Sequence, residues 1–349
     1  MEKIDPSPDH YSRIYAKTMN NYICLLAHWD LTYKCNLRCR HCYAQGEKSR
    51  EEVSYVKAKS IIDELKEMGC LYLVFSGGEI LLRADFFDIA SYARKQGFAL
   101  RLLTNGTLID ETTSKRIASL YPLTVEMSIY AADKSLHDTI TSVIGSFDRT
   151  IDAVALLKKR NLRVILKFLV MQDNVKEFRA VKSLAENLGV DFLFDFCVVT
   201  SDSGSDTPLK YRLNRVQLKD FFISNGIPLL EREAQEEALL CSAGLNNIFI
   251  TPYLDVYPCI GIKYKIGNLW ETSLRELWHS AKLNFIREIQ TSDLYKCAQC
   301  EVRQFCSRCL GIAMIEDGDM FGPSSFDCAV AAVKKEVLEP KKEMVADEK

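Results

Sequence analysis

Two hydrophobic patterns alternate along residues 27–200 of this 349-residue chain. Short runs rich in β-branched, aromatic and aliphatic residues are typical of strands, whereas apolar residues that recur every three or four positions indicate amphipathic helices. The runs that predict strands are "AHWDLTYK", "LYLVFSGG", "ALRLLTNG", "TVEMSIY", "RVILKFLVM" and "DFLFDFCVV". Helical stretches separate these runs, so the pattern predicts repeated strand–helix units.

The predicted helices carry recognisable end signals. "KAKSIIDELKEMG" has one apolar face and ends on Gly69, which predicts a helix stop. "SFDRTIDAVALLKKRN" begins with Ser146, which we predict to be the N-cap, and "NVKEFRAVKSLAENLG" closes on Gly189.

Alternating strands and helices favour an α/β fold with a parallel sheet and right-handed crossovers. Six units fit either a partial barrel or a doubly wound open sheet, and the pattern alone leaves both open. In either case chemistry gathers at the carboxyl ends of the strands. The most distinctive residues lie there: three cysteines after the first strand, "SGGE" after the second, "TNG" after the third and Ser128 in the fourth.

The second half of the chain has a different organisation. The polar stretch "SDSGSDT" at 201–207 predicts a boundary, and a helical connector follows it. "NNIFITPYLDVYPC" alternates like a hairpin around "PYLD". The final "VKKEVLEPKKEMVADEK" is a charged tail, expected to be a solvated helix end followed by disorder.

Composition narrows the partners. With 48% hydrophobic and 26% charged residues the chain is of ordinary globular type, and its net charge of −2 makes nucleic acid an unexpected partner. The amino terminus lacks the apolar core of a signal peptide, and no apolar run is long enough to span a bilayer. We therefore expect a cytoplasmic protein with no membrane partner.

Thirteen cysteines change this ordinary picture. In a reducing compartment dense cysteine indicates metal or redox chemistry rather than disulfides. Three lie at 35–42 and seven between 241 and 328. The isolated Cys24, Cys70 and Cys197 are expected to be small core residues.

The first cysteine group is one ligand short. Zinc and ordinary iron–sulfur clusters take four ligands, and His41 would complete a zinc site only with strain because it lies between two of the cysteines. A cubane cluster held by three thiolates instead leaves one iron open. That iron can chelate an amine and a carboxylate, as offered by the methionine end of S-adenosylmethionine.

"WDLTYKCNLRCRHCY" closely resembles the radical S-adenosylmethionine superfamily, and the resemblance covers about residues 25 to 200. It implies a partial (β/α)6 barrel like that of TIM proteins and a [4Fe-4S] cluster on Cys35, Cys39 and Cys42. It also implies reductive cleavage of S-adenosylmethionine to a 5′-deoxyadenosyl radical, with a reductant such as flavodoxin or ferredoxin. Residue by residue, the resemblance implies cofactor contacts from Tyr43, Gly77, Gly78, Glu79, Asn105 and Ser128.

One cofactor contact departs from the family pattern. Relatives often carry arginine where this chain has Thr141, so Lys167 on the fifth strand is our candidate for the cofactor carboxylate. In "GGEI" the glycines are expected to let the backbone approach the cofactor, and Glu79 to accept a hydrogen bond from its ammonium group.

The second cysteine group resembles the SPASM domain, with "YPC" and "GNLWETSLRELWHS" as supporting motifs over about residues 238 to 330. This implies two auxiliary iron–sulfur clusters. The first would take Cys241, Cys259 and Cys309, and the second Cys297, Cys300, Cys306 and Cys328. A zinc ribbon is the alternative, but seven cysteines divide poorly into zinc tetrahedra.

Three details of this domain stay open. Leu254 replaces the glycine usual in the hairpin, which should alter the turn rather than the ligands. The two-residue spacing between Cys306 and Cys309 is shorter than the common one and also occurs in relatives that modify haem precursors. The fourth ligand of the first auxiliary cluster could be Cys197, a non-cysteine residue or substrate.

These signals divide the chain into five parts: an N-terminal extension (1–24), the radical core (25–200), a connector (201–237), the SPASM domain (238–330) and a charged tail (331–349). The leading hypothesis is a maturase that abstracts hydrogen from a ribosomally made peptide. Because the segment before the first strand is short, leader recognition would fall to a separate protein.

Two other functions remain open, namely a tetrapyrrole-modifying enzyme and a non-catalytic electron-transfer module. The sequence assigns no acid–base residue. Asp30 and Tyr33 are candidates by location alone, and packed strand residues are the alternative.

Overall fold

A computed structural model describes residues 10–44, 50–202, 204–229 and 241–346. One nine-stranded sheet runs in the order β6-β5-β4-β3-β2-β1-β7-β8-β9. Its strands are β1 (Leu26–Thr32), β2 (Tyr72–Gly77), β3 (Ala99–Thr104), β4 (Thr124–Ile129), β5 (Val164–Leu169), β6 (Asp191–Asp195), β7 (Asn247–Ile250), β8 (Asp255–Tyr257) and β9 (Gly267–Asn268). The first six correspond to the six predicted strands.

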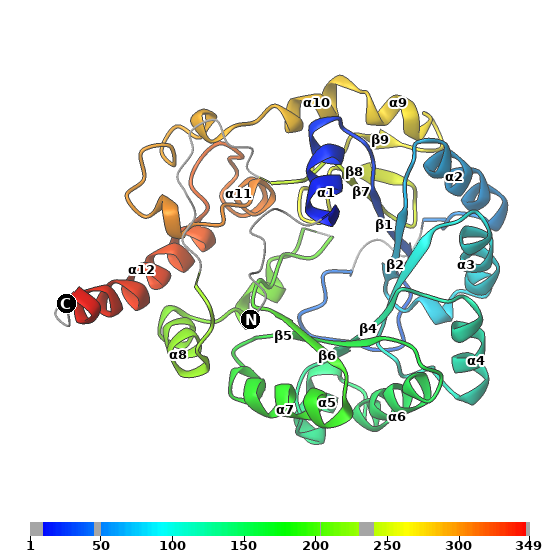
Figure 1. Ribbon diagram of the computed structural model, residues 1–349, viewed down its shortest axis with the longest axis horizontal. Helices are drawn as coiled ribbons and strands as arrows, with labels where there is room; N and C mark the ends of the chain where they lie inside the picture. The colour runs from blue at the N-terminus through cyan, green and yellow to red at the C-terminus, as the bar shows by residue number, and fades with distance from the viewer. Residues whose placement is uncertain (1–9, 45–49, 203, 230–240, 347–349) are drawn as a thin grey trace.

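The order of the strands confirms the partial barrel. β1 to β6 are parallel and follow one another in chain order, so every crossover advances in the same direction. A doubly wound sheet would instead reverse its strand order at a switch point. Figure 1 shows the strands curving around an interior with the helices outside.

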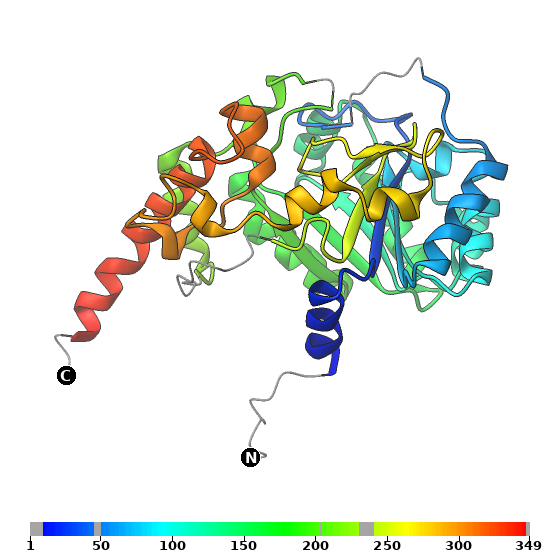
Figure 2. The same cartoon turned by 90° about the horizontal axis from the view of Figure 1, so that it is seen from above.

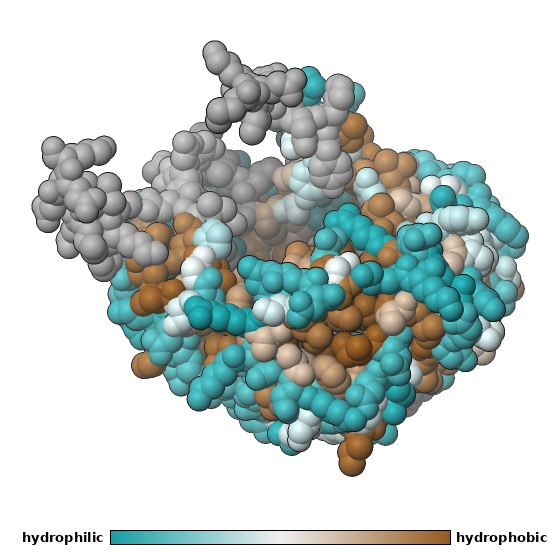
Figure 3. Space-filling view, turned by 60° about the horizontal axis from the view of Figure 1, so that its bottom comes forward, coloured by the Kyte–Doolittle hydropathy of each residue, from teal (hydrophilic) through white to brown (hydrophobic). Residues whose placement is uncertain are grey.

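Helices α2 to α7 cover the outer surface of the sheet, whereas α1 lies below the barrel and α11 and α12 lie to one side of it (Figures 1 and 2). The helices are α1 (His10–Asn20), α2 (Tyr55–Glu67), α3 (Phe86–Lys95), α4 (Glu111–Ser119), α5 (Lys134–Thr141), α6 (Ser146–Lys158), α7 (Phe178–Leu188), α8 (Arg215–Asn225), α9 (Leu274–Trp278), α10 (Ala281–Arg287), α11 (Leu310–Glu316) and α12 (Ser325–Ala346). Short 3-10 turns include η1 (Ile80–Leu82) and η3 (Thr207–Tyr211). Figure 3 brings forward the side where α5, α6 and α7 lie and shows apolar side chains between ridges of polar ones.

Alternation along β1 separates the core from the barrel interior. Ala27, Trp29 and Leu31 are fully buried in the hydrophobic core with residues of the covering helices. His28 and Asp30 lie on the opposite face because successive strand side chains alternate. The main core therefore lies between sheet and helices, and polar groups are left for the interior.

The predicted helix ends are mostly right. α2 ends just before Gly69, which has a positive φ of 84°, and Gly189 caps α7 with a φ of 61°. The N-cap prediction for α6 is wrong, because Gly145 occupies that position and Ser146 is the first helical residue. The Ser146 hydroxyl instead donates to Asp138 of α5, at 2.8 Å.

The tail differs from its predicted solvated state. Residues 331–346 continue α12, and Val333 and Val337 are buried in the main core, which also includes Phe221 and Phe222 of α8. Glu336 pairs with Arg215 and Lys219 of α8. The connector and the tail thus support each other.

The SPASM region joins the barrel through the sheet. β7 pairs in parallel with β1, and the predicted hairpin is present as antiparallel β7 and β8. In Figure 2 its hairpin and helices lie along the side of the barrel. Within the described residues, no helix has the length and apolar character required to cross a bilayer.

Leu254, in the turn between β7 and β8, takes a left-handed conformation with φ of 67° while its side chain is fully buried. The turn therefore keeps the conformation that glycine adopts easily, and the leucine does not have to alter it. The left-handed region costs a non-glycine residue about 1–2 kcal/mol, and burial of a leucine returns about 1.5–3 kcal/mol.

Leu254→Ala and Leu254→Gly both remove the buried side chain, but only alanine keeps the strain. We expect thermal melting of the anaerobically reconstituted protein to rank wild type above Leu254→Gly and Leu254→Ala lowest, with about 1 kcal/mol between the two variants. Alanine melting above glycine would show that the turn is unstrained.

Candidate active site

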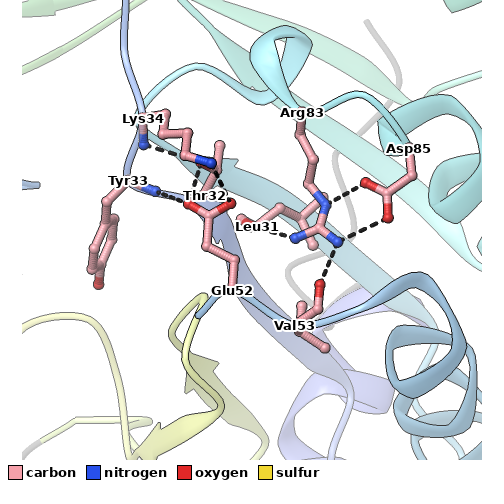
Figure 4. Close-up of polar contacts among 8 residues, drawn as sticks. All are labelled: Leu31, Thr32, Tyr33, Lys34, Glu52, Val53, Arg83 and Asp85. Atoms are coloured by element: carbon pink, nitrogen blue, oxygen red, sulfur yellow. Dashed lines mark hydrogen bonds and ion pairs between the residues drawn. The ribbon is translucent and has the colours of Figure 1, made fainter. Parts of the chain in front are cut away.

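The chain after β1 is held in place before it reaches the first cysteines. Arg83 donates to the backbone carbonyls of Leu31 and Val53 and forms a two-point ion pair with Asp85. Figure 4 shows this arginine inserted between the end of β1 and the 52–53 segment. A planar guanidinium can hold three such partners at once.

Glu52 fixes the same strand end from the other side (Figure 4). Its Oε1 accepts hydrogen bonds from the Thr32 hydroxyl at 2.6 Å and the Tyr33 amide at 3.3 Å. Lys34 lies 3.9 Å from Oε2. The residues next to Cys35 therefore begin from a fixed backbone.

Gly77 and Gly78 bring the end of β2 against that backbone. The amide of Gly78 donates to the Thr32 carbonyl at 2.7 Å, and the next amide, of Glu79, donates to the Lys34 carbonyl at 2.8 Å. A Cβ at Gly77 would lie 2.2 Å from the Thr32 oxygen, and one at Gly78 would lie 2.3 Å from the Lys34 oxygen. The glycines are thus required for contact with the cysteine loop, whatever they contribute to a cofactor.

Glu79 ties the second strand end to the third. Its fully buried carboxylate accepts from the Thr104 hydroxyl at 2.8 Å, the Asn105 amide at 2.8 Å and the Leu81 amide at 3.1 Å. Burial raises the pKa of this carboxyl, while these donors oppose the shift. The predicted contact between Glu79 and a cofactor ammonium stays a prediction, because protein donors surround the carboxylate.

Asn105 brings the "TNG" motif to the first cysteine. Its side-chain amide lies 3.8 Å from the Cys35 sulfur and donates to Asn36 at 2.9 Å. The oxygen of the same side-chain amide, Oδ1, accepts hydrogen bonds from the Thr107 amide and hydroxyl. An amide directed at a ligand sulfur is the kind of contact that tunes an iron–sulfur cluster.

The three thiols of the first group are neighbours. Burial, and then the nearby Cys42 and Cys35 thiols, raise the pKa of Cys39, while a hydrogen bond with the Tyr130 hydroxyl opposes the shift. Tyr130 also hydrogen-bonds to Ser128, which brings the "MSIY" motif to the same place. Such buried thiols are stable as thiolates only beside a strong positive charge, which cluster iron supplies.

His41 does not behave as a ligand in this arrangement. Its ring packs edge-to-face on Tyr130, 4.6 Å between centroids, and burial lowers its pKa to about 4. Among the residues that the structure describes, no set of His, Cys, Asp and Glu is gathered tightly enough for a single metal ion.

The interior face of the barrel carries a polar group that the sequence only partly revealed. Asp30 is fully buried, 3.5 Å from His28 Nε2 and 3.4 Å from the Tyr43 hydroxyl. Burial raises the pKa of Asp30, and its contact with His28 opposes the shift. Tyr33, the other location-based candidate, packs its ring against Tyr253 and hydrogen-bonds to Asp202, so its role stays a prediction.

Lys167 lies on the same interior face but already has a partner. Its ammonium is 3.3 Å from Glu126 of β4, which also pairs with Arg101 of β3. Glu126 is fully buried, whereas the two cations are partly exposed. Neither Glu126 nor Arg101 was predicted from the sequence; the available signal was a carboxylate among the otherwise uncharged residues of "TVEMSI".

Thr141 has no free surface to offer a cofactor. It is fully buried, and its hydroxyl lies 2.7 Å from that of Ser146. Its carbonyl accepts from the Arg38 amide at 2.9 Å, so the end of α5 supports the cysteine loop. The Lys167 assignment remains a prediction.

The seven later cysteines form two groups of neighbouring thiols that match the predicted sets, and their roles as cluster ligands stay a prediction. Burial raises the pKa of Cys259 to about 12, and the nearby Cys241 and Cys309 thiols add to this shift. Burial also raises the pKa of Cys306 to about 12. Asp327 and three neighbouring thiols add to this shift, namely those of Cys328, Cys297 and Cys300. The donor chemistry of both sets fits iron–sulfur clusters.

Comparison with known proteins agrees with this geometry. The Radical SAM superfamily model matches residues 29–185, and the SPASM iron-sulfur cluster-binding domain matches residues 241–309. A mycofactocin maturase, MftC of Mycobacterium tuberculosis (strain H37Rv), is 30% identical over 310 residues, 82% of this chain and 77% of the relative. The chain belongs to the radical SAM superfamily.

Two further likenesses define the range of the family around this radical SAM/SPASM enzyme. An AdoMet-dependent heme synthase of Oleidesulfovibrio alaskensis is 28% identical over 325 residues, 82% of each chain. The crystal structure of Streptococcus suis SuiB bound to precursor peptide SuiA has a TM-score of 0.70 at 17% identity and covers 94% of this chain and 83% of that one. The last likeness shows the fold alone.

Membership establishes [4Fe-4S] clusters and S-adenosylmethionine as the cofactors of this radical SAM enzyme. Membership also excludes the hypothesis that the whole chain is a non-catalytic electron-transfer module. The assignment of individual cysteines as cluster ligands, and of individual residues as cofactor contacts, stays a prediction.

Gly77→Ala and Gly97→Ala form a matched pair, because both glycines have positive φ, 125° and 100°, but only a Cβ at Gly77 meets another atom. We expect Gly77→Ala to displace the cysteine loop and to lower S-adenosylmethionine cleavage under dithionite by about a hundredfold. Gly97→Ala should lose only stability, about 1 kcal/mol. Equal cleavage by the two variants would show that the contact with Thr32 does not position the cluster.

Proposed function

We propose that this enzyme is a maturase that acts on a ribosomally made peptide. The 30% identity to a mycofactocin maturase over 82% of this chain is the observation that carries the proposal. When bound, the first cluster and S-adenosylmethionine supply a 5′-deoxyadenosyl radical. The other steps of the reaction depend on how residues of the chain bind and orient the substrate.

The sheet edge favours an extended substrate. β6 is the edge strand, and Leu193 and Phe194 on it are partly exposed. No strand in the described residues pairs with its outer side, so this part of the barrel wall is incomplete. In this proposal a peptide segment enters from that side toward the ends of β1 to β4.

The polar groups on the interior face of the barrel are suited to accept the proton that the substrate loses after hydrogen-atom abstraction. Forming a cross-link by removing two hydrogens from a peptide takes one hydrogen atom, then one proton and one electron. The His28–Asp30 pair faces the interior, and burial that raises the pKa of Asp30 brings it closer to neutral pH, where a base works best. We assign the proton to this pair and the electron to the auxiliary clusters.

Modification of a tetrapyrrole is the second candidate. It is supported by the 28% identity to an AdoMet-dependent heme synthase and by the short Cys306–Cys309 spacing. Arg101 and Lys167 are partly exposed cations on the interior face and would suit propionate groups.

An anaerobic assay with two substrates separates these candidates. We expect mass spectrometry to show loss of two hydrogen atoms from a candidate precursor peptide, chosen from short reading frames near the gene, and iron coproporphyrin III to remain unchanged. The Cys35→Ala, Cys39→Ala, Cys42→Ala variant should leave both unchanged. Decarboxylation of the porphyrin with an intact peptide would replace the maturase by the tetrapyrrole enzyme.

A further inference from the structure

Cys197 follows β6 on the barrel, far in sequence from the SPASM cysteines, and it does not behave as the core residue that the sequence favoured. Cys24 and Cys70 are buried in the main hydrophobic core, as expected. Cys197 is only half-buried and belongs to none of the hydrophobic clusters found in the described residues. Its neighbour Val198 is the core residue.

The backbone around Cys197 is fixed toward the auxiliary domain. The Asp195 carboxylate accepts from the amides of Phe196 and Cys197, at 2.6 and 2.9 Å, and so turns the chain at the end of β6. Arg212 then donates to the Val198 carbonyl at 2.6 Å. A thiol on this segment has a defined direction rather than a freely moving one.

Arg212 joins this segment to the part of the chain that carries Cys309. Its guanidinium forms a two-point ion pair with Glu316, both distances 2.6 Å, and lies 4.1 Å from the ring centroid of Phe326. Glu316 ends α11, the helix that begins directly after Cys309. Both segments and the start of α12 are thereby fastened to one side chain.

A second contact joins the start of α11 to the start of α12. The amide of Cys309 donates to Asp327 at 2.8 Å, so the start of α12 lies against the start of α11. The thiols of Cys197 and Cys309 lie close enough to interact electrostatically, as the thiols of Cys241 and Cys259 also do with Cys309.

We propose that Cys197 is the fourth ligand of the first auxiliary cluster, beside Cys241, Cys259 and Cys309. The cluster then has a complete set of four thiolates, three from the SPASM region and one from the end of a barrel strand. Completion by the protein leaves no iron for substrate, so this cluster passes electrons rather than binding the substrate. The proposal rests on family membership and not on the identity of the substrate.

The test uses protein in which Cys35, Cys39 and Cys42 are alanine, so that only auxiliary clusters remain. After anaerobic reconstitution, this parent should hold about eight irons, four for each cubane, and its reduced EPR spectrum should not respond to cyanide. Cys197→Ala should either lose up to about four irons or gain a cyanide-sensitive signal. Cys197→Ser, which keeps size and a weaker oxygen donor, should retain iron with an altered spectrum.

Two matched variants serve as controls. Cys70→Ala removes a buried thiol elsewhere and should match the parent, and Asp327→Asn should stay insensitive to cyanide because Asp327 holds the Cys309 amide rather than iron. The proposal is overturned if both Cys197 variants match the parent, if the parent itself binds cyanide, or if only Asp327→Asn opens a site. None of these readouts requires substrate, so failure here is distinct from failure of the maturase proposal.

Discussion

The close contact between the ends of β1 and β2 is the constraint on which the active site depends. Two adjacent amides, of Gly78 and Glu79, donate to carbonyls on either side of Tyr33, and there is no room for a side chain between the two segments. The cysteine loop begins directly beyond that contact. Its position is therefore set by backbone hydrogen bonds, which are less adjustable than side-chain contacts.

Buried and half-buried carboxylates extend this constraint around the barrel. Glu79 joins the ends of β2 and β3, Glu52 holds the end of β1, and Asp138 supports the helix end that receives the Arg38 amide. Each accepts from backbone amides or hydroxyls rather than standing alone, as burial of a charged group requires. A radical enzyme gains from such rigidity, because a reactive intermediate must meet only the intended bond.

Much of this organisation could be predicted from sequence, because local rules agree with the final fold. The six strands, the hairpin, and the helix ends at Gly69 and Gly189 follow from periodicity and from the conformational freedom of glycine. Ser146 was misread because a serine before a helical pattern is a usual N-cap, whereas the tertiary contact with Asp138 uses its hydroxyl elsewhere. The tail was misread because its charge concealed the valines that pack near α8.

The long-range parts of the site could not be predicted in the same way. The Glu126 network joins three strands, and the position of Cys197 depends on an arginine 15 residues later and a helix more than 100 residues later. Motif spacing reports contacts within a loop, but it carries no information on which distant loop completes a site. The glycines of "SGGE" show a related limit. Their residue type indicated a close backbone approach, but the sequence did not show which segment they approach.

Parallel pairing of β7 with β1 has a consequence for how the enzyme handles its substrate. The same strand that leads into the first cysteine loop is hydrogen-bonded on one side to the barrel and on the other to the SPASM hairpin. Separation of the two regions would break a continuous sheet, so the clusters are held at a fixed spacing throughout turnover. Substrate exchange therefore leaves the sheet intact, because neither the barrel mouth nor the side beside β6 requires the two regions to separate.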